Sequence, residues 1–192
     1  MLNSTKFHKK CKNITFDYIS EPDNGMYDAI AKGFQKINGD VVAYLNSDDY
    51  YLPNAFQAIY LMFTHYKTLD WLTGVITVYN KYGNIVKLNT PYFYSRTFIK
   101  KGIYGKYLPF IQQESCFWRK GLLDKINLNK FASYKYAGDY YLWHEFSKYA
   151  NLEILNTPLS GFRTHAGNKS QNIKAYFEEF DSIKSMETTL MD

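Results

Sequence analysis

The sequence predicts an α/β fold in which helices cover a sheet, on three observations. Phe16–Ile19 has the composition of a short strand, and the turn residues 20–25 separate it from an amphipathic helix. Val41–Leu45 is a short apolar run bounded by turn residues, which is typical of a buried strand in a parallel sheet. Pro53 can open a second helix. This alternation indicates βαβ organisation with a covered parallel sheet.

Each of the two predicted helices has an apolar face that would pack on the sheet. In the first helix apolar residues recur at helical spacing, and a residue pair that tolerates positive φ ends it. The second helix is expected to turn four large apolar side chains inward. The two faces are Tyr27, Ile30, Phe34 and Ile37, followed by Asn38-Gly39, and Phe56, Ile59, Tyr60 and Phe63.

The rest of the chain predicts a hairpin, an aromatic and basic loop, and further strands and helices. In order, these are the hairpin strands 71–79 and 85–88, a loop with a short helix at 90–110, a strand at 114–118, a helix from Asp139, two short strands at 152–155 and 159–162 around Pro158, and a last amphipathic helix over Ile173–Ile183. In the helix from Asp139, the residues expected to face inward are Leu142, Trp143, Phe146 and Tyr149.

The 192-residue chain has an ordinary globular composition, and we expect residues 1–192 to form a single domain. Hydrophobic residues make up 46% and charged residues 21%, which excludes disorder across the whole chain. Cys11 and Cys116 lack Cys or His neighbours at ligand spacing, so neither a disulfide framework nor a zinc site follows. No segment has the apolar length of a signal peptide or a membrane span, which favours a cytoplasmic protein.

The formal net charge of +5 mildly favours anionic partners such as phosphates, nucleotides or an acidic membrane surface. The basic residues near the start form only a short tail, and charges of both signs follow along the chain. Nucleic acid is therefore not an expected partner. Aromatic residues reach 19%, which suits either a surface that stacks on ring-shaped ligands or drift in composition.

The adjacent carboxylates Asp48 and Asp49 form the first candidate site. They come directly after a predicted buried strand, where open α/β sheets bind ligands. Because like charges repel, a hard divalent cation with oxygen ligands would stabilise the pair and could bridge to a phosphate. The alternative is a solvated turn that caps the helix at Pro53, and the dipeptide alone favours that alternative.

Three further segments could carry chemistry. Asp139 stands at a predicted helix start, where it can cap the helix or take a proton from a hydroxyl nucleophile. His165 could ligate a dication and Arg163 could face a diphosphate, or both could simply be exposed. The turn Glu21–Gly25 precedes a helix N-terminus, whose free amides attract phosphate, although an ordinary capped turn has the same sequence.

In their order and neighbourhoods these segments resemble the family 2 glycosyltransferases, which have the GT-A fold, a Rossmann-like mixed sheet flanked by helices. The resemblance covers roughly residues 14–172, and five blocks together make it specific. The family begins with a βαβ unit that this chain lacks, so the resemblance implies an N-terminally truncated domain. The blocks are Ser20–Ala29, Gly39–Asp49, Gln113–Arg119, Tyr136–Trp143 and Gly161–His165.

The resemblance implies a role for each site residue. Asp139 would be the catalytic base, and Asp49 with His165 would bind a divalent cation, Mn²⁺ or Mg²⁺. Residues on the donor side would be Glu21, Asp23, Asp48 and Arg163, and residues on the acceptor side would be Gln113, Glu114 and Trp143.

The implied activity is an inverting, metal-dependent transfer of a sugar from a nucleotide diphosphate-sugar to a hydroxyl of a glycan or lipid-linked acceptor. The protein would act in the cytoplasm or peripherally at the inner membrane face. The alternative is a non-catalytic remnant that binds carbohydrate or a partner. Because a missing βαβ unit would leave a strand edge open beside Phe16–Ile19, we also expect self-association or a chain that completes the sheet.

Overall fold

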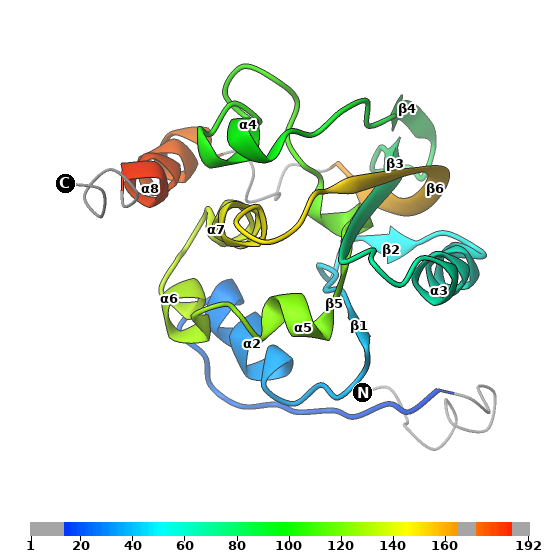
Figure 1. Cartoon of the computed structure of the whole chain (residues 1–192), viewed down its shortest axis with the longest axis horizontal. Coiled ribbons are helices and arrows are strands. Elements are labelled where there is room, and N and C mark those ends of the chain that lie inside the picture. The colour runs from blue at the N-terminus through cyan, green and yellow to red at the C-terminus, as the bar shows by residue number, and fades with distance from the viewer. Residues whose placement is uncertain (1–13, 165–171, 186–192) are drawn as a thin grey trace.

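The computed structural model describes residues 14–164 and 172–185. They form a mixed sheet flanked by helices, with α3 on one face and α7 on the other (Figure 1). The elements are α2 (Met26–Phe34), β1 (Val41–Val42), β2 (Tyr50–Tyr51), α3 (Ala55–His65), β3 (Trp71–Tyr79), β4 (Ile85–Asn89), α4 (Arg96–Lys100), the 3₁₀ turn η1 (Gln113–Ser115), β5 (Phe117–Arg119), α5 (Lys120–Leu123), α6 (Leu128–Ala132), α7 (Gly138–Phe146), β6 (Glu153–Arg163) and α8 (Ile173–Ser185).

The sheet is mixed rather than parallel, which corrects the parallel sheet expected from strand composition. Its strand order is β1-β5-β3-β6-β2, and β4 pairs with β3. Among the strands that the structure describes, only β3 and β6 run parallel, and the other pairs are antiparallel. Short apolar strands buried on both faces look alike in either direction, so composition could not distinguish the two arrangements.

Alternating residues of β3 face two separate hydrophobic cores. Trp71 belongs to the larger core, which α7 completes, whereas Leu72 packs with Ile59 and Phe63 of α3. Both side chains are fully buried. Because β3 contributes to both cores, its position determines how the helices on the two faces lie relative to one another.

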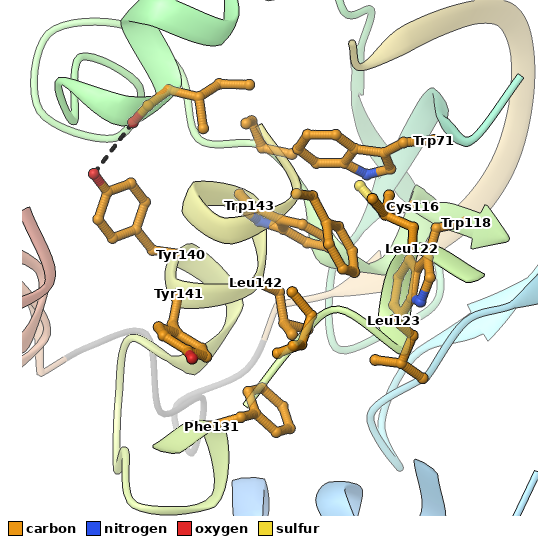
Figure 2. Close-up of a cluster of buried hydrophobic side chains, with 14 of the residues drawn as sticks. Trp71, Cys116, Trp118, Leu122, Leu123, Phe131, Tyr140, Tyr141, Leu142 and Trp143 are labelled. Atoms are coloured by element: carbon orange, nitrogen blue, oxygen red, sulfur yellow. Dashed lines mark hydrogen bonds between the residues drawn. The ribbon is translucent and has the colours of Figure 1, made fainter. Parts of the chain in front are cut away.

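The larger core is built from aromatic rings (Figure 2). The ring of Trp71 stacks on Trp143 with their centroids 5.3 Å apart, and Trp118 meets Trp143 edge-on at 5.9 Å. The hydroxyl of Tyr140 donates a hydrogen bond to the carbonyl of Ile99 at 3.2 Å. Much of the aromatic excess therefore packs the interior, where large rings bury apolar area.

Several predicted elements are confirmed. The hairpin corresponds to β3 and β4, and the aromatic loop contains the short helix α4. The helix from Asp139 corresponds to α7, and the last amphipathic helix to α8. Among the described residues no helix is long and apolar enough to cross a membrane.

Other strand predictions were wrong. Phe16–Ile19 is not a strand: the segment has no regular secondary structure, and Tyr18 and Ile19 are more than half exposed. The two short strands around Pro158 are one strand, β6, because the irregular register beside Val75 accommodates the proline.

The inner face of α3 and the end of α2 also differ from expectation. On α3 the inward residues include Ala55, while Phe56 and Tyr60 are about two-thirds exposed, at 64% and 67%. The first helix, α2, ends at Phe34, before the expected Asn38-Gly39 pair. Large apolar residues on both sides of α3 made its inner face ambiguous in the sequence.

β3 and β6 approach each other closely at Gly74. A Cβ atom at this position would lie 2.4 Å from the Cδ1 of Leu159 and 2.9 Å from the carbonyl oxygen of Thr157. Gly74→Ala should therefore destabilise the protein by about 1–3 kcal/mol in urea unfolding, because the Thr157 carbonyl belongs to the β6 backbone and the Leu159 side chain is fully buried. Gly33→Ala is the matched control: its Cβ would meet nothing within 4 Å, so it should be neutral or stabilise by about 0.5–1 kcal/mol. Equal effects of the two substitutions would contradict this close approach.

Candidate active site

Asp49 is fixed at the start of β2 by the pairing of that strand with β6. The register places Tyr50 opposite Gly161, and Asp49 Oδ1 accepts a hydrogen bond of 3.1 Å from the backbone N–H of Arg163. The Asp49 side chain is buried at 9% exposure. Burial raises its pKa, although the hydrogen bond from Arg163 and one from Asn46 partly oppose the shift.

Asn46 joins this aspartate to the turn η1. Its Nδ2 donates to Asp49 Oδ2 and to Gln113 Oε1, each at 3.3 Å. The Gln113 amide donates in turn to the carbonyl of Tyr44. The loop after β1 and the turn before β5 are thus held together by side-chain amides, and Gln113 and Glu114 are brought beside the paired aspartates.

Glu114 is a buried carboxyl with an unmet hydrogen-bonding atom. It is 6% exposed, and its Oε2 has no hydrogen-bond partner among the described residues. Burial raises its pKa to about 8; its own backbone N–H opposes the shift, and Asp49, Asp139 and Asp48 add to it. Glu114 is therefore neutral at pH 7 and can donate a hydrogen bond.

Asp139 lies in the first turn of α7. Its Oδ1 accepts hydrogen bonds from the backbone N–H of Tyr140 at 2.7 Å and from the hydroxyl of Tyr176 at 3.3 Å. Burial raises the pKa of Asp139 to about 6, and these hydrogen bonds, with one from Tyr27, prevent a larger shift. At neutral pH this carboxylate is ionised yet close to its pKa, as a proton acceptor should be.

The carboxyls come from three separate segments and act on one another. Asp49 and Asp48 from the loop before β2, and Asp139 from α7, all raise the pKa of Glu114 on η1. Such a concentration of acids costs free energy unless protons or cations neutralise it. Functional sites are a common place for this kind of arrangement.

The paired aspartates fit part of a divalent cation site. Carboxylate oxygens are the ligands that Mg²⁺ and Mn²⁺ prefer, and a cation would offset the repulsion between the acids. Within the described ranges no group of three or more His, Cys, Asp or Glu residues is arranged to hold a metal. His165, the other predicted ligand, lies outside the described residues.

Glu21 and Asp23 lie in the exposed segment before α2. Asp23 Oδ1 accepts a hydrogen bond of 2.9 Å from the backbone N–H of Gly25, and Asp28 accepts one of 2.8 Å from the backbone N–H of Asn24. These are local bonds at a helix N-terminus. A role in donor binding stays a prediction for both Glu21 and Asp23.

Trp143 packs the core rather than lining an open surface. It is 2% exposed and stacks on Trp71. With Tyr140 and Tyr176 it also lines a small hollow between α4, α7 and α8. Contact between Trp143 and an acceptor therefore stays a prediction, whereas its packing role is clear.

Sequence reasoning missed two residues that hold the site together. Asn46 was only part of a turn, and its distance of 67 residues from Gln113 gave no sign of their hydrogen bond. Tyr176 lies within the predicted last helix, but nothing in the pattern indicated a hydrogen bond to Asp139. Two signals were available in the sequence. Asn46 is a polar residue near the paired aspartates, and Tyr176 is a tyrosine within an apolar stripe.

The comparison with protein families identifies the chain. The profile of glycosyl transferase family 2 matches residues 4–126, more than half of the chain. This chain belongs to glycosyl transferase family 2. No curated protein matches its sequence at a significant level.

Solved structures show that the fold is GT-A. A crystal structure of S. aureus TarS 1-349 is 14% identical, with a TM-score of 0.56 over 83% of this chain and 47% of that one. A second, in complex with UDP-GlcNAc, is 13% identical, with a TM-score of 0.58 over 94% and 52%. The chain spans about half the length of these TarS structures.

The buried Glu114 makes a prediction about stability and pH. Its pKa of about 8 in the fold lies above the ordinary 4.5, so the native state holds a proton that the unfolded chain releases. Glu114 should therefore contribute a fall in the free energy of unfolding of about 1.4 kcal/mol per pH unit between those values, and Glu114→Gln should remove that contribution. Urea unfolding with a chelator present, at about pH 5 and about pH 8, measures both proteins.

The exposed Glu153→Gln is the control, because solvent surrounds that carboxyl in both states. The increase in the free energy of unfolding caused by Glu114→Gln should grow with pH. The free energy of unfolding of the control should change with pH as that of the unsubstituted protein does. A pH-independent difference for Glu114→Gln would show that Glu114 carries an ordinary carboxylate.

Proposed function

We propose that this chain transfers a sugar from a nucleoside diphosphate-sugar to a hydroxyl group of an acceptor. The observation that carries the proposal is that the buried Glu114 feels the charges of Asp49 and Asp139, so that carboxyls from three segments lie within electrostatic reach of one another. Membership of glycosyl transferase family 2 supports the reaction class. The complex of its structural neighbour TarS with UDP-GlcNAc supports a nucleotide-sugar donor.

Asp139 is the proposed catalytic base. With a pKa of about 6 it is ionised at neutral pH and can take the proton of the acceptor hydroxyl. The acceptor oxygen forms a bond to the anomeric carbon as the bond from that carbon to the diphosphate breaks. The proton goes to Asp139 and the electron pair leaves with the nucleoside diphosphate. A single displacement of this kind inverts the anomeric carbon.

On the donor side, Asp49 and His165 are the proposed ligands of a divalent cation, and Asp48 is proposed to hold the ribose or sugar. When bound, Mn²⁺ or Mg²⁺ supplies positive charge beside the leaving diphosphate. Arg163, Glu21 and Asp23 are the further proposed donor contacts. The hydrogen bond from the backbone of Arg163 to Asp49 supports this grouping, because it holds the end of β6 beside the aspartates.

On the acceptor side, Gln113, Glu114 and Trp143 are the proposed residues. The neutral Glu114 can donate a hydrogen bond from its unpartnered Oε2 to a sugar hydroxyl. The acceptor is proposed to be a glycan or a lipid-linked saccharide.

The second candidate function is a non-catalytic carbohydrate-binding domain. Buried aromatic residues weigh against it, because Trp71, Trp118 and Trp143 pack the core and are not available to stack on sugars. The raised pKa of Asp139 also favours an enzyme, since binding alone requires no buried base.

Asp139→Asn should lower turnover about 10²-fold or more while leaving the fold intact, because an amide cannot accept the proton. Release of nucleoside diphosphate from a panel of UDP- and GDP-sugars, with Mn²⁺ and an acceptor mixture, measures turnover. The activity of the unsubstituted protein should fall as the pH drops through about 6, where Asp139 becomes protonated.

Asp124→Asn is the matched control, because Asp124 is exposed and pairs only locally with Lys120 at 2.6 Å. It should leave turnover unchanged. Near-normal turnover in Asp139→Asn would reduce Asp139 to a helix cap. No turnover with any donor in a folded sample, together with glycan binding, would favour the non-catalytic alternative.

A further inference from the structure

The edge strand β4 exposes apolar side chains on both of its faces. Ile85 and Val86 are neighbours and so point to opposite sides of the strand, yet they are 61% and 57% exposed. Among the described strands, β4 pairs only with β3. The other edge of β4 therefore pairs with no described strand, and such an edge invites association in water.

The exposed apolar surface continues beyond β4. Figure 1 shows β4, α4 and the segment between them along one rim of the molecule. We call this surface the basic-apolar rim. Its large side chains that are more than half exposed are Tyr82, Ile85, Val86, Leu88, Tyr92 and Phe93. Single exposed apolar residues are ordinary, but a group of this size within one short stretch of the chain indicates a contact surface.

The charges of the rim are all positive. The sequence contains no Asp or Glu between Asp70 and Glu114. Two cations of this stretch are engaged within the fold: Arg96 donates to two carbonyls after α7, and Lys106 pairs with Asp181 of α8. The lysines left at the rim are Lys81, Lys87, Lys100 and Lys101, which are exposed or half-exposed.

We propose that the basic-apolar rim docks the protein on the surface of an anionic lipid bilayer. Tyrosine and lysine side chains suit the level of the lipid headgroups, because each combines an apolar body with a polar tip. The lysines attract anionic headgroups, and the apolar side chains enter the boundary with the acyl chains.

A second copy of this chain fits the rim less well. Antiparallel pairing of two β4 edges about the centre of the strand would place Lys87 opposite its counterpart. Like charges directly opposite one another destabilise a strand pair. An anionic surface instead matches every charge on the rim.

This inference goes beyond sugar transfer and does not depend on it. Docking on a bilayer would keep the protein close to acceptors carried on lipids.

Co-sedimentation of the full chain with vesicles tests the proposal. Vesicles of equal parts phosphatidylcholine and phosphatidylglycerol should bind the protein, and vesicles of phosphatidylcholine alone should not. Lys87→Glu/Lys101→Glu should weaken binding by about fivefold or more for each lysine. Val86→Glu/Phe93→Glu should abolish binding, because it removes the apolar contact.

The matched controls are Tyr60→Glu and Lys67→Glu, exposed positions on and just after α3, away from the rim. Both should bind the anionic vesicles as the unsubstituted protein does, and circular dichroism should be unchanged in every variant. Three results would overturn the proposal: no binding to anionic vesicles, equal losses in rim and control variants, or a dimer that Val86→Glu disrupts in the absence of vesicle binding.

Discussion

The pairing of β6 with strands on both of its sides is the constraint on which the candidate site depends. β6 runs parallel to β3 from Glu153 to Arg163 and antiparallel to the short β2. The two residues of β2 could not hold a position alone, because so short a strand makes few hydrogen bonds. Its register with β6 places the backbone N–H of Arg163 on Asp49. Through β6, the central core fixes the Asp49 carboxylate, although Asp49 and Arg163 are far apart in the sequence.

The turn η1 holds the other side of the site, because it is tied both to β3 and to the loop before β2. Ser115 is fully buried, and its hydroxyl lies 2.8 Å from that of Thr73 on β3. This contact anchors η1 to the central strand, while Gln113 reaches the loop before β2 through Asn46. Glu114 stands between these two anchors. Its burial is therefore imposed by its neighbours, and the free energy of keeping it there is a cost that a purely structural residue would not need to bear.

α7 supplies the remaining carboxyl from the opposite direction. The stacking of Trp143 on Trp71 holds this helix against β3, and Gly138 allows the ring of Tyr27 to pack at its start, 2.6 Å from where a Cβ would lie. Asp139 is consequently held at the first turn of a helix whose other residues are largely buried. The aromatic core thus positions the proposed base.

The sequence predicted the fold class, and its local patterns supplied the candidate site residues, whose roles stay predictions. Paired acids such as Asp48 and Asp49, and an acid at a helix start such as Asp139, are local patterns that need no knowledge of the fold. The direction of the strands, and whether Phe16–Ile19 forms a strand, depend on pairing with segments distant in the chain. The periodicity of a sequence carries no information about those segments. The raised pKa of Glu114 could not be predicted either, because it arises from burial and from charges on other segments.

The central claim is that carboxyls from three segments converge, and the titration of Glu114 tests it most directly. Carbon NMR of the labelled Glu114 carboxyl, in the presence of a chelator, would follow its pKa in the unsubstituted protein, in Asp49→Asn and in Asp139→Asn. We expect a pKa of about 8 that falls in both variants, because each removes a negative charge that opposes ionisation of Glu114. An ordinary pKa near 4.5, unchanged by either substitution, would show that these residues do not share one site.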